Sequence, residues 1–427
     1  MPNSHISRPP KKMPSRILHI PRRFAIDEWG GTESVIFNLC KQQQASGQVA
    51  EIHTSRALSP TAQEVWRNIP IHRYRYCYPF LGLSPADVLA LDKKGGNLLS
   101  LDLFYHLLTA QNVRIYHAHV LKRMGGAVLT AARLRKKPFV ATLHGNVFDV
   151  PADEAAAIVA PQEGHLEWGK PFGALFRSRH LLEDADAVLC VGYSEYEKAR
   201  TALNHERIYH LPNGVSPESF ANGDRSAGRK HLNWPDNAIA FGCLSRIDPQ
   251  KNQALLIQSF ASLVKSQTHR QFRLLLGGPI TDPNYHQTLV DLIANHGIGD
   301  LVTLHPSVVA ESTQHRDLLA ALDVFVLPSR HEPFGIVILE AWAAGLPVIA
   351  AKVGGLQKLI SHAEDGLHFP SGDAPALTAA LATLSSDPSY RHSLAAAGLA
   401  KVLRQYTWKA VAAQLELIYQ TAESRHS

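Results

Sequence analysis

The sequence predicts an α/β protein with two doubly wound domains, each built on a mainly parallel sheet. Short apolar, β-branched runs alternate with helical patterns along the whole chain, which is typical of parallel strands joined by crossover helices. A length of 427 residues exceeds what one hydrophobic core usually organises, and 45% apolar residues supply enough material for two cores. We therefore expect two globular domains of ordinary size.

Ten segments have the length and composition of buried strands. In the first half we expect strands at 16–20, 50–54, 113–117, 138–143 and 187–191. In the second half we expect them at 239–244, 272–276, 301–304, 324–327 and 347–350. Helical patterns separate most of them, as the doubly wound arrangement requires.

The boundary between the domains is expected after the segment LPNGV at 211–215. Its Pro-Asn-Gly turn signal is followed by a polar, Gly-rich stretch, so we place the linker at about 212–229. The N-terminal domain then spans 15–211 and the C-terminal domain 212–405, after a disordered basic tail at 1–14. Residues 406–427 repeat apolar side chains at helical spacing behind Thr407, and we expect a helix there that packs back on the N-terminal domain.

Composition excludes several classes of protein. A charged fraction of 19% argues against a disordered or fibrous chain, and a net charge of +6 is too small for a nucleic-acid-binding stripe. The longest apolar run, 334–351, contains Glu340 and a Gly-Leu-Pro break, so it cannot cross a bilayer as one helix. The N-terminal segment lacks the apolar core of a secretory signal. We expect a cytoplasmic protein that does not bind nucleic acid.

The four cysteines are far apart in the sequence and have no CxxC spacing. A zinc ribbon or a disulfide framework is therefore not expected. We expect buried, reduced thiols at all four positions, which are Cys40, Cys77, Cys190 and Cys243.

The segment SRHEPFGIVILEAWAAGLPV follows the expected strand at 324–327. It therefore begins at the carboxyl end of a strand, where open α/β sheets bind ligands. Pro333 and Gly335 mark a turn, and a helix is expected to begin near Phe334. The free amides of Phe334, Gly335 and Ile336 would then point toward an anion such as a phosphate.

Two glutamates bracket this turn and helix. The helix around Glu340 is apolar on all sides and thus buried, so its carboxylate needs a partner. A structural ion pair or a neutral acid would satisfy it, and so would a ribose diol that donates two hydrogen bonds. Glu332 could simply be a favourable negative charge near a helix N-terminus, or it could act together with the turn and Glu340.

Two cations follow the expected strand at 239–244. Arg246 ends the segment IAFGCLSR, and the loop IDPQ delivers Lys251 just before Asn252, a suitable N-cap for the next helix. Such side chains are usually solvated surface groups. A pair of them beside an anion-binding helix start is better explained by a diphosphate, which Arg binds as a fork and Lys as a point charge.

These motifs together resemble those of a known enzyme family. E-P-F-G-I-V-I-L-E, with seven residues between its glutamates, and S-R-I-D-P-Q-K-N are similar to motifs of glycosyltransferase family 4, the retaining group 1 glycosyltransferases of GT-B fold. The resemblance covers nearly the whole chain and implies two Rossmann-like domains that face each other across a cleft. It further implies that Arg246 and Lys251 neutralise the donor diphosphate, that Glu340 holds the ribose, and that Glu332 grips the transferred sugar. The backbone at Phe334, Gly335, Ile336 and Val337 would assist at the sugar and the phosphates.

The first half supplies further candidates. Gly30 and Gly31 precede a helix that begins near Thr32, and such a pair allows a ligand to approach the backbone, although an ordinary tight turn would also explain it. The family resemblance of W-G-G-T-E implies a loop that faces donor phosphates and acceptor, which places Glu33 on the acceptor side. His144 follows the strand FVATLH; it is a structural histidine or, by the resemblance of its H-G motif, a contact to the donor sugar near the reacting carbon. We expect His119 to line the acceptor pocket.

Two other hypotheses concern metal and membrane. His117, His119 and His144 could form a zinc site, but no carboxylate or thiolate completes it at a fixed spacing, so we expect no metal. Basic residues bracket a helix in the first domain and are either a solvated face or, if they share a face, a peripheral contact with anionic lipid worth about 1 kcal/mol each. They are Lys122, Arg123, Arg133, Arg135, Lys136 and Lys137.

The expected reaction moves a hexose from a UDP- or GDP-type nucleotide sugar to a saccharide or lipid-linked acceptor with retention of configuration. Arg246, Lys251 and the helix N-terminus would stabilise the growing charge of the leaving diphosphate, so no metal or other cofactor is required. Polysaccharide or glycolipid synthesis is the pathway that the family implies. The alternatives are an epimerase that hydrolyses its donor, a non-catalytic binding module, and a glycoside hydrolase with paired carboxylates, which the apolar helix of Glu340 argues against.

Overall fold

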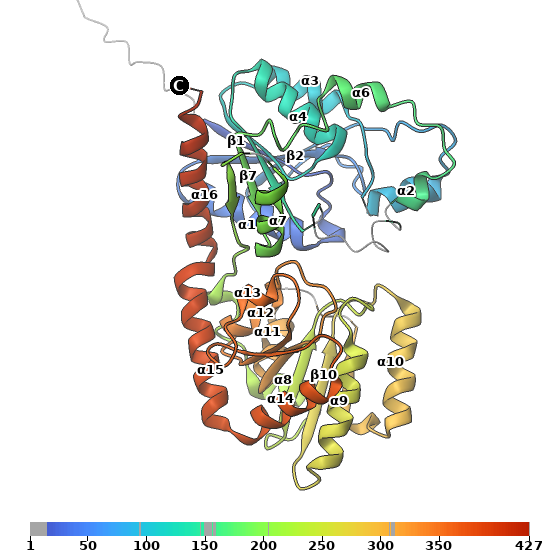
Figure 1. Cartoon of the computed structure of the whole chain (residues 1–427), viewed down its shortest axis with the longest axis vertical. Coiled ribbons are helices and arrows are strands. Elements are labelled where there is room, and N and C mark those ends of the chain that lie inside the picture. Colours follow the sequence, from blue (N-terminus) through green and yellow to red (C-terminus); the bar gives the residue numbers. More distant parts are fainter. Residues whose placement is uncertain are drawn as a thin grey trace, which may run out of the picture. The chain divides into compact units, whose positions relative to one another are not determined.

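The computed structural model describes residues 15–93, 95–145, 147–148, 156, 159–203, 205–306, 308 and 312–426. The expected basic tail at 1–14 lies outside this part of the chain. Two compact units are present, and each is described separately (Figure 1). The first contains the described residues within Met1–Leu189, Arg200–Tyr209 and Gln414–Ser427, and the second contains Cys190–Ala199 and the described residues within His210–Ala413. The segment 212–229, where the linker was expected, belongs to the second unit.

The first unit is built on an eight-stranded sheet of order β3-β4-β2-β1-β5-β6-β7-β8. β1 pairs in parallel with β2 and β5, and β5 with β6, whereas β3 is antiparallel to β4. The strands are β1 Arg16–Ile20, β2 Val49–Ser55, β3 Gln63–Trp66, β4 Ile69–Tyr74, β5 Val113–Ala118, β6 Phe139–Leu143, β7 Ala187–Cys190 and β8 Ile208–His210. The helices between them are α1 Gly31–Ala45, α2 Pro85–Lys93, α3 Leu101–Thr109, α4 Lys122–Leu134, α6 Lys170–Leu175 and α7 Tyr193–Ala202, of which residues 193–199 belong to the second unit.

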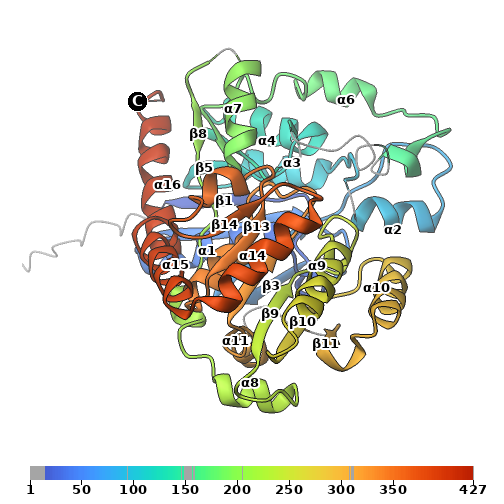
Figure 2. The same cartoon turned by 60° about the horizontal axis from the view of Figure 1, so that its bottom comes forward.

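The second unit is built on a six-stranded parallel sheet of order β11-β10-β9-β12-β13-β14. Its strands are β9 Ile239–Leu244, β10 Phe272–Gly277, β11 Val302–His305, β12 Val324–Leu327, β13 Val348–Ala351 and β14 Leu367–Phe369. Its helices are α8 Arg225–His231, α9 Gln253–Ser266, α10 Pro283–His296, α11 Thr313–Ala320, α12 Ile336–Ala343, α13 Leu356–Leu359, α14 Ala374–Ser386 and α15 Pro388–Lys401. α9 packs against both α10 and α14 (Figure 2).

The ten expected strands are all present, with ends within one residue of those predicted, and the doubly wound fold class is confirmed. Four strands were not predicted. β3 is an edge strand with no buried residue, β4 contains Pro70, and β8 and β14 have three residues each. None of them forms the long, apolar, β-branched run by which the others were recognised.

The strand order of both sheets reverses at a central pair of neighbours. In the first sheet the reversal lies between β1 and β5, and in the second it lies between β9 and β12. Ligands of doubly wound sheets bind beyond the carboxyl ends of the strands at such a point. The loops that follow these four strands are therefore where each unit can carry a site.

The last helix, α16 Trp408–Glu423, begins behind Thr407, whose hydroxyl accepts a hydrogen bond from the Ala410 amide at 3.2 Å. A turn of π-helix, Val402–Tyr406, joins it to α15. The part from Gln414 onward belongs to the first unit (Figure 1). There Arg114 of β5 bonds to both Glu416 and Glu423 at 2.7 Å. The charge pairs fix this segment against β5.

Two expectations about burial and membrane insertion can be compared with the structure. Cys40, Cys190 and Cys243 are buried free thiols as expected, but the prediction was wrong for Cys77, which is exposed. Its segment forms only an isolated bridge to Leu99 and lies in no strand or helix core. Among the described residues, no helix is both long and apolar enough to span a membrane.

Candidate functional site

In the second unit, the loops after β9 and β12 are joined by hydrogen bonds. The Arg330 amide donates to the Gln250 carbonyl at 2.8 Å, and the Gln250 side-chain amide donates to the His331 carbonyl at 3.2 Å. Both loops lie at the point where the strand order reverses. The sequence placed them at strand ends but did not identify Gln250 as the residue that links them.

Lys251 and Glu332 form the shortest charged contact of this region. The Lys251 Nζ donates to Glu332 Oε2 at 2.6 Å, and both side chains are nearly buried, with about a tenth of each exposed. The Lys251 amide also bonds to Asp248 Oδ1 at 3.2 Å, which fixes the loop. The structure thus brings together two residues that the sequence analysis selected from motifs far apart in the chain.

Arg246 is the more accessible cation. Its side chain is 46% exposed, and its Nη2 lies 3.2 Å from Gln250 Oε1 and 3.3 Å from Asp248 Oδ2. The Arg246 carbonyl accepts a hydrogen bond from the Gln253 side chain at 2.8 Å, which anchors the backbone beneath it. The guanidinium is therefore oriented by two neighbours while much of it faces solvent.

The helix after Glu332 begins later than predicted. α12 starts at Ile336 rather than near Phe334, because Gly335 adopts a left-handed conformation with φ of 96° and serves as the N-cap. The amides of Ile336 and Val337 are therefore in the first turn of the helix, where N–H groups have no intrahelical acceptor. Phe334 precedes the helix and its side chain is buried.

Glu340 lies in the second turn of α12 and is less buried than the apolar helix suggested. Its side chain is 15% exposed, and its Oε2 lies 4.0 Å from Nε2 of His315 on α11. Burial lowers the pKa of His315 to about 4, so the ring is neutral at neutral pH. His315 was not selected from the sequence, because a single histidine within a helix gives no signal of its own.

A pair of glycines supports the Glu332 loop and was also not predicted. The Gly355 amide donates to the Glu332 carbonyl at 2.9 Å. A Cβ atom on Gly354 would lie 2.3 Å from the Glu332 carbonyl oxygen, and one on Gly355 would lie 2.1 Å from that of Pro333. The Gly pair just after β13 could have been recognised by the same reasoning that was applied to Gly30 and Gly31.

A pocket of about 390 Å³ lies beside this region, near the start of α9. Arg330 lines it, and the Lys251–Glu332 pair does not. Its lining residues are Asn252, Ala254, Leu255, Gln258, Arg330, Ser371 and Gly372. Asn252 was expected to cap α9 with its side chain, but it has a φ of 56° and makes no such hydrogen bond.

In the first unit, Gly30 and Gly31 form the start of α1 as expected. Gly30 is the N-cap, and a Cβ atom there would lie 3.0 Å from Oε2 of Glu33. Glu33 is only 4% exposed, and burial raises the pKa of its carboxyl while Arg23, at 3.8 Å, opposes that rise. Glu33 thus lies beneath the glycine loop.

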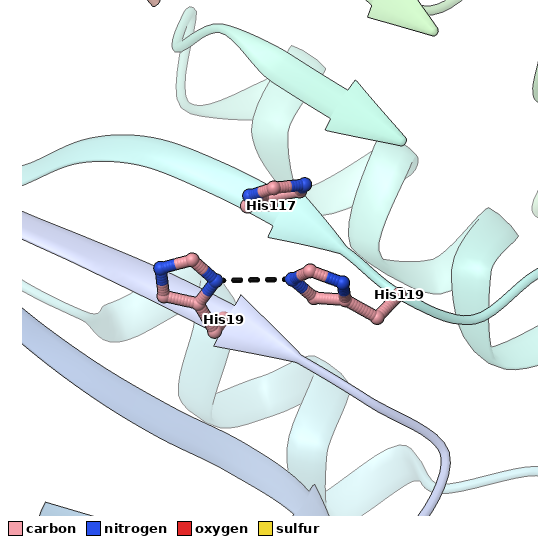
Figure 3. Close-up of side chains that lie close together, drawn as sticks. All are labelled: His19, His117 and His119. Carbon is pink, nitrogen blue, oxygen red and sulfur yellow. Dashed lines mark hydrogen bonds between the residues drawn. The ribbon is translucent and has the colours of Figure 1, made fainter. Parts of the chain in front are cut away.

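His144 and His119 come together at the ends of β6 and β5. Nε2 of His144 lies 3.0 Å from Nδ1 of His119. Nε2 of His119 in turn lies 3.0 Å from Nδ1 of His19 on β1 (Figure 3). His144 is partly exposed, whereas His119 and His19 are buried. The sequence analysis selected the first two residues and missed His19, although β1 pairs His19 with His117.

Two clusters among the described residues have the spacing of metal ligands. One consists of His19, His117 and His119, whose ligand atoms lie within 4.8 Å of one another, so His19 takes the place that the zinc hypothesis gave to His144. Both ring nitrogens of His117 are already hydrogen-bonded, to Tyr419 and Thr142 at 2.6 Å. A metal ion would have to displace one of these partners.

The second such cluster consists of Glu51, His53 and His72, on the neighbouring strands β2 and β4. Arg16 bonds to both carboxylate oxygens of Glu51 and so competes with any cation. Although burial opposes the change, hydrogen bonds from His53 and Arg16 lower the pKa of Glu51 to about 2. This group is therefore a paired structural carboxylate.

The basic residues around α4 do not form one solvated face. Arg123 is buried and bonds to the carbonyls of Asn97 and Gly169, and Arg133 pairs with Asp184 at 2.8 Å. Lys136 and Lys137 remain exposed at the end of the helix. The expected membrane contact therefore has fewer available cations than the sequence suggested.

The arrangement in the second unit is suited to an anion. Arg246 and Lys251 supply positive charge, and the first turn of α12 supplies backbone N–H groups beside Glu332. Fixed groups of this kind stabilise negative charge that develops on a leaving group. In the first unit, His144 offers a neutral ring at a strand end, because desolvation lowers its pKa to about 4.

Family models match both halves of the chain. Residues 224–401 match the family model for glycosyl transferases group 1, and residues 29–219 match that for glycosyltransferase family 4. A D-inositol 3-phosphate glycosyltransferase from Stackebrandtia nassauensis is 30% identical over 414 residues, which cover 93% of this chain and 88% of that protein.

Two further proteins illustrate the range of similarity. A GDP-mannose-dependent alpha-(1-6)-phosphatidylinositol monomannoside mannosyltransferase from Mycolicibacterium smegmatis is 30% identical over 287 residues, 64% of this chain and 72% of that one. The crystal structure of Anabaena HepE in complex with UDP aligns with a TM-score of 0.71 at 19% identity, over 95% of this chain and 100% of that one. The latter similarity concerns the fold.

Proposed function

Because the chain belongs to the group 1 glycosyltransferases of GT-B fold, we propose that it moves a hexose from a nucleoside diphosphate sugar to a hydroxyl group of a saccharide or lipid-linked acceptor, with retention of configuration. The observation that carries the proposal is the Lys251–Glu332 pair at 2.6 Å, placed just before the first turn of α12 and beside Arg246. It combines a cation for the phosphates with an acceptor for sugar hydroxyls.

The donor is held by the second unit in this proposal. Arg246 and Lys251 bind the diphosphate, and the amides of Gly335, Ile336 and Val337 add hydrogen bonds to its oxygens. Phe334 and Glu332 contact the sugar, and Glu340 accepts hydrogen bonds from the ribose diol. The partial exposure of Glu340 supports this role, because a ligand can reach the carboxylate.

The first unit contributes the groups near the reacting carbon. His144 contacts the donor sugar, and Gly30 and Gly31 allow close approach of the donor phosphates and the acceptor. Glu33 supports the glycine loop from below. Since both ring nitrogens of His119 are bonded to other histidines, we propose that His119 acts through His144 rather than by lining the acceptor pocket.

The chemical step forms a bond between the acceptor oxygen and the anomeric carbon while the bond from that carbon to the diphosphate oxygen breaks. The leaving diphosphate takes the acceptor proton on the same face, which gives retention. Its growing negative charge is stabilised by Arg246, Lys251 and the first turn of α12. These groups supply the positive charge that a divalent metal supplies in other transferases, so the proposed reaction requires no metal.

The names of the two relatives suggest the first acceptors to test. They name D-inositol 3-phosphate and a phosphatidylinositol monomannoside, which are a phosphorylated polyol and a mannosylated inositol phospholipid. We propose an acceptor in this range, used in glycolipid or polysaccharide synthesis in the cytoplasm. Lys136 and Lys137 are exposed and could contact an anionic membrane that presents the acceptor.

The experiment has two stages. Thermal shift with UDP-, GDP- and ADP-sugars is expected to select one donor, whose stabilisation is lost in Arg246→Ala. Transfer is then measured with that donor and the two acceptor types, and the anomeric configuration of the product is read by NMR. Product formed equally without an acceptor would identify a hydrolase or epimerase instead. Absence of stabilisation by every donor would contradict the proposal.

A further inference from the structure

A chain of buried hydrogen bonds leads from α1 to His144. Gln43 Oε1 of α1 lies 2.8 Å from Nε2 of His19. Nδ1 of His19 lies 3.0 Å from Nε2 of His119 (Figure 3), and Nδ1 of His119 lies 3.0 Å from Nε2 of His144. Within the part of the chain that the structure describes, Nδ1 of His144 is the one nitrogen of these three rings without a hydrogen-bond partner. The chain therefore ends at a free ring nitrogen on a partly exposed residue.

The rings of this chain are neutral at neutral pH. Burial lowers the pKa of His19 to about 4 and that of His119 well below its ordinary value, and desolvation lowers that of His144 to about 4. A neutral imidazole carries one N–H and one lone pair, so each ring donates from one nitrogen and accepts at the other. Every hydrogen bond in the chain must then run in the same direction.

Gln43 sets that direction. Its Oε1 can only accept, so Nε2 of His19 donates and Nδ1 of His19 accepts. His119 must therefore donate from Nε2 to His19 and accept at Nδ1, which requires His144 to donate from Nε2. The Nδ1 of His144 then carries a lone pair.

A second set of bonds holds the Gln43 amide in this orientation. Its Nε2 lies 3.5 Å from the hydroxyl of Tyr419, which lies 2.6 Å from Nδ1 of His117. His117 in turn lies 2.6 Å from the Thr142 hydroxyl. Rotating the amide by half a turn would require all of these partners to exchange donor and acceptor roles together. The orientation of the amide is thus coupled to a cooperative network rather than to one bond.

We propose that Gln43, His19 and His119 are positioning residues that hold His144 in the Nε2–H tautomer, so that its Nδ1 accepts a hydrogen bond from a hydroxyl group of the donor sugar. The proposal rests on the proposed function, in which His144 meets the donor. It assigns to His144 the role of an acceptor that selects and orients a hydroxyl. A general acid would need the opposite arrangement, with a proton on the free nitrogen.

The tautomer can be measured without any substrate. Two-dimensional ¹H–¹⁵N spectra of histidine-labelled protein at neutral pH distinguish the two neutral forms, and the His144→Asn variant assigns the signal. We expect the Nε2–H form for His144 in the wild type. An Nδ1–H form or an imidazolium ring at neutral pH would overturn the proposal.

Two variants of His119 test the positioning role. His119→Gln retains one acceptor for His144 and one donor for His19, so it should preserve the tautomer and most of kcat/KM. His119→Leu removes both, so the tautomers of His144 should mix and kcat/KM should fall by about tenfold, the effect of losing one hydrogen bond. An unchanged tautomer in His119→Leu, or a loss in His119→Gln equal to that in His119→Leu, would contradict the inference.

Tyr116→Phe is the matched control. It removes a buried hydrogen bond of β5, from the Tyr116 hydroxyl to the Leu107 carbonyl at 2.8 Å, which is not connected to the chain that leads to His144. It should lower stability while leaving the His144 tautomer and kcat/KM near wild type. A loss of kcat/KM equal to that of His119→Leu would mean that the network is only structural.

Failure of the inference and failure of the proposed function give different results. If the wild type transfers sugar but His144→Asn does so at the same rate, the role of His144 is wrong and the transferase function stands. If the wild type transfers no sugar to any acceptor, the proposed function fails, and the role of His144 in it fails too. The tautomer experiment still decides whether Gln43 and His19 orient the ring.

Discussion

The two units support their candidate sites with opposite physical means. In the second unit, Lys251 and Glu332 are charged and 2.6 Å apart, and Arg246 beside them is half exposed. In the first unit, His19 and His119 are buried and neutral, and they lead to His144 through hydrogen bonds of 3.0 Å. The site in the second unit is built from charged groups, and the site in the first unit is built from neutral groups in a directed chain of hydrogen bonds.

The difference corresponds to the two demands of sugar transfer. Negative charge accumulates on a leaving diphosphate, and only positive charge or fixed dipoles can stabilise it. A sugar hydroxyl remains neutral and needs only a correctly oriented donor or acceptor. A cation in place of the histidine network would be costly, because burial of an unpaired charge is unfavourable.

The largest effect is expected for the loss of the Lys251 charge. Lys251→Gln should lower kcat/KM by about 100- to 1,000-fold, because one group that stabilises the leaving diphosphate is lost. The glutamine amide can still donate to Glu332, which is 8% exposed, so the fold should survive. Steady-state kinetics and circular dichroism check both statements. Undiminished turnover would show that the charged site does not serve the diphosphate.

The neutral character of the histidine network should appear in the pH dependence of stability. His19 has a pKa of about 4 in the folded protein and an ordinary value of 6.5. As the folded pKa is the lower one, the unfolded chain binds protons first, and stability falls as pH drops from about 6.5 toward 4. Between pH 7 and pH 5, the wild type should lose about 2 kcal/mol more unfolding free energy than His19→Gln.

Urea denaturation at the two pH values measures this difference. His180→Gln is the control, because His180 is an exposed histidine of the same unit. An identical pH dependence in wild type and His19→Gln would mean that the network is charged in the folded state.

The glycine support of the charged site can be tested by Gly355→Ala. A Cβ atom there would lie 2.1 Å from the Pro333 carbonyl oxygen, so the Glu332 loop must move. We expect a loss of stability of about 1–3 kcal/mol, as for overpacked sites, together with weaker donor binding. Gly299→Ala is the control, because nothing lies within 4 Å of its added Cβ atom. Equal thermal unfolding of the two variants would contradict this reading of the loop.

A smaller effect is expected where charge is kept and geometry is lost. Arg246→Lys retains the cation but removes the forked guanidinium, which lies near Gln250 and Asp248. We expect kcat/KM to fall by about tenfold, corresponding to about 1.4 kcal/mol. Isothermal titration with the selected donor should show the same loss in affinity. A loss as large as that of Lys251→Gln would show that the fork, rather than charge alone, dominates at the phosphates.

The smallest expected effect is that of a chelator. If protein cations alone stabilise the leaving group, excess EDTA should leave the transfer rate unchanged. The assay uses dialysed enzyme, with magnesium and manganese added back separately. Complete inhibition that either metal reverses would replace the proposed role of Arg246 and Lys251 with a metal-assisted one.

The sequence predicted well those features that depend on short, local patterns. The ten apolar strands were recognised because a continuous run of apolar, β-branched residues leaves a strong signal over four to six residues. The charged residues Arg246, Lys251 and Glu332 were found because each follows such a strand directly. The Lys251–Glu332 contact could not be predicted in detail, since it depends on how two loops pack.

The features that were missed depend on contacts between distant residues. Neither His19 nor Gln43 forms a motif by itself. The fold joins Gln43 of α1 to His19 of β1, and His19 to His119, and these contacts cannot be recognised from the sequence. The start of α12 was placed too early because the apolar pattern extends through Phe334, whereas the left-handed Gly335 delays the helix. Cys77 was predicted to be buried on composition alone, and its loop is exposed.

The return of the chain to the first unit has a consequence for biosynthesis. Tyr419 bonds to His117, and Glu416 and Glu423 bond to Arg114, so β5 lacks these partners until residues 414–423 have left the ribosome. By then the whole second unit has been translated and, as domains generally fold in order of synthesis, can already be folded. The synthesis of the first unit therefore begins first, and its structure is completed last. In a nascent chain shorter than 414 residues, His117 would lack its hydrogen-bond partner Tyr419.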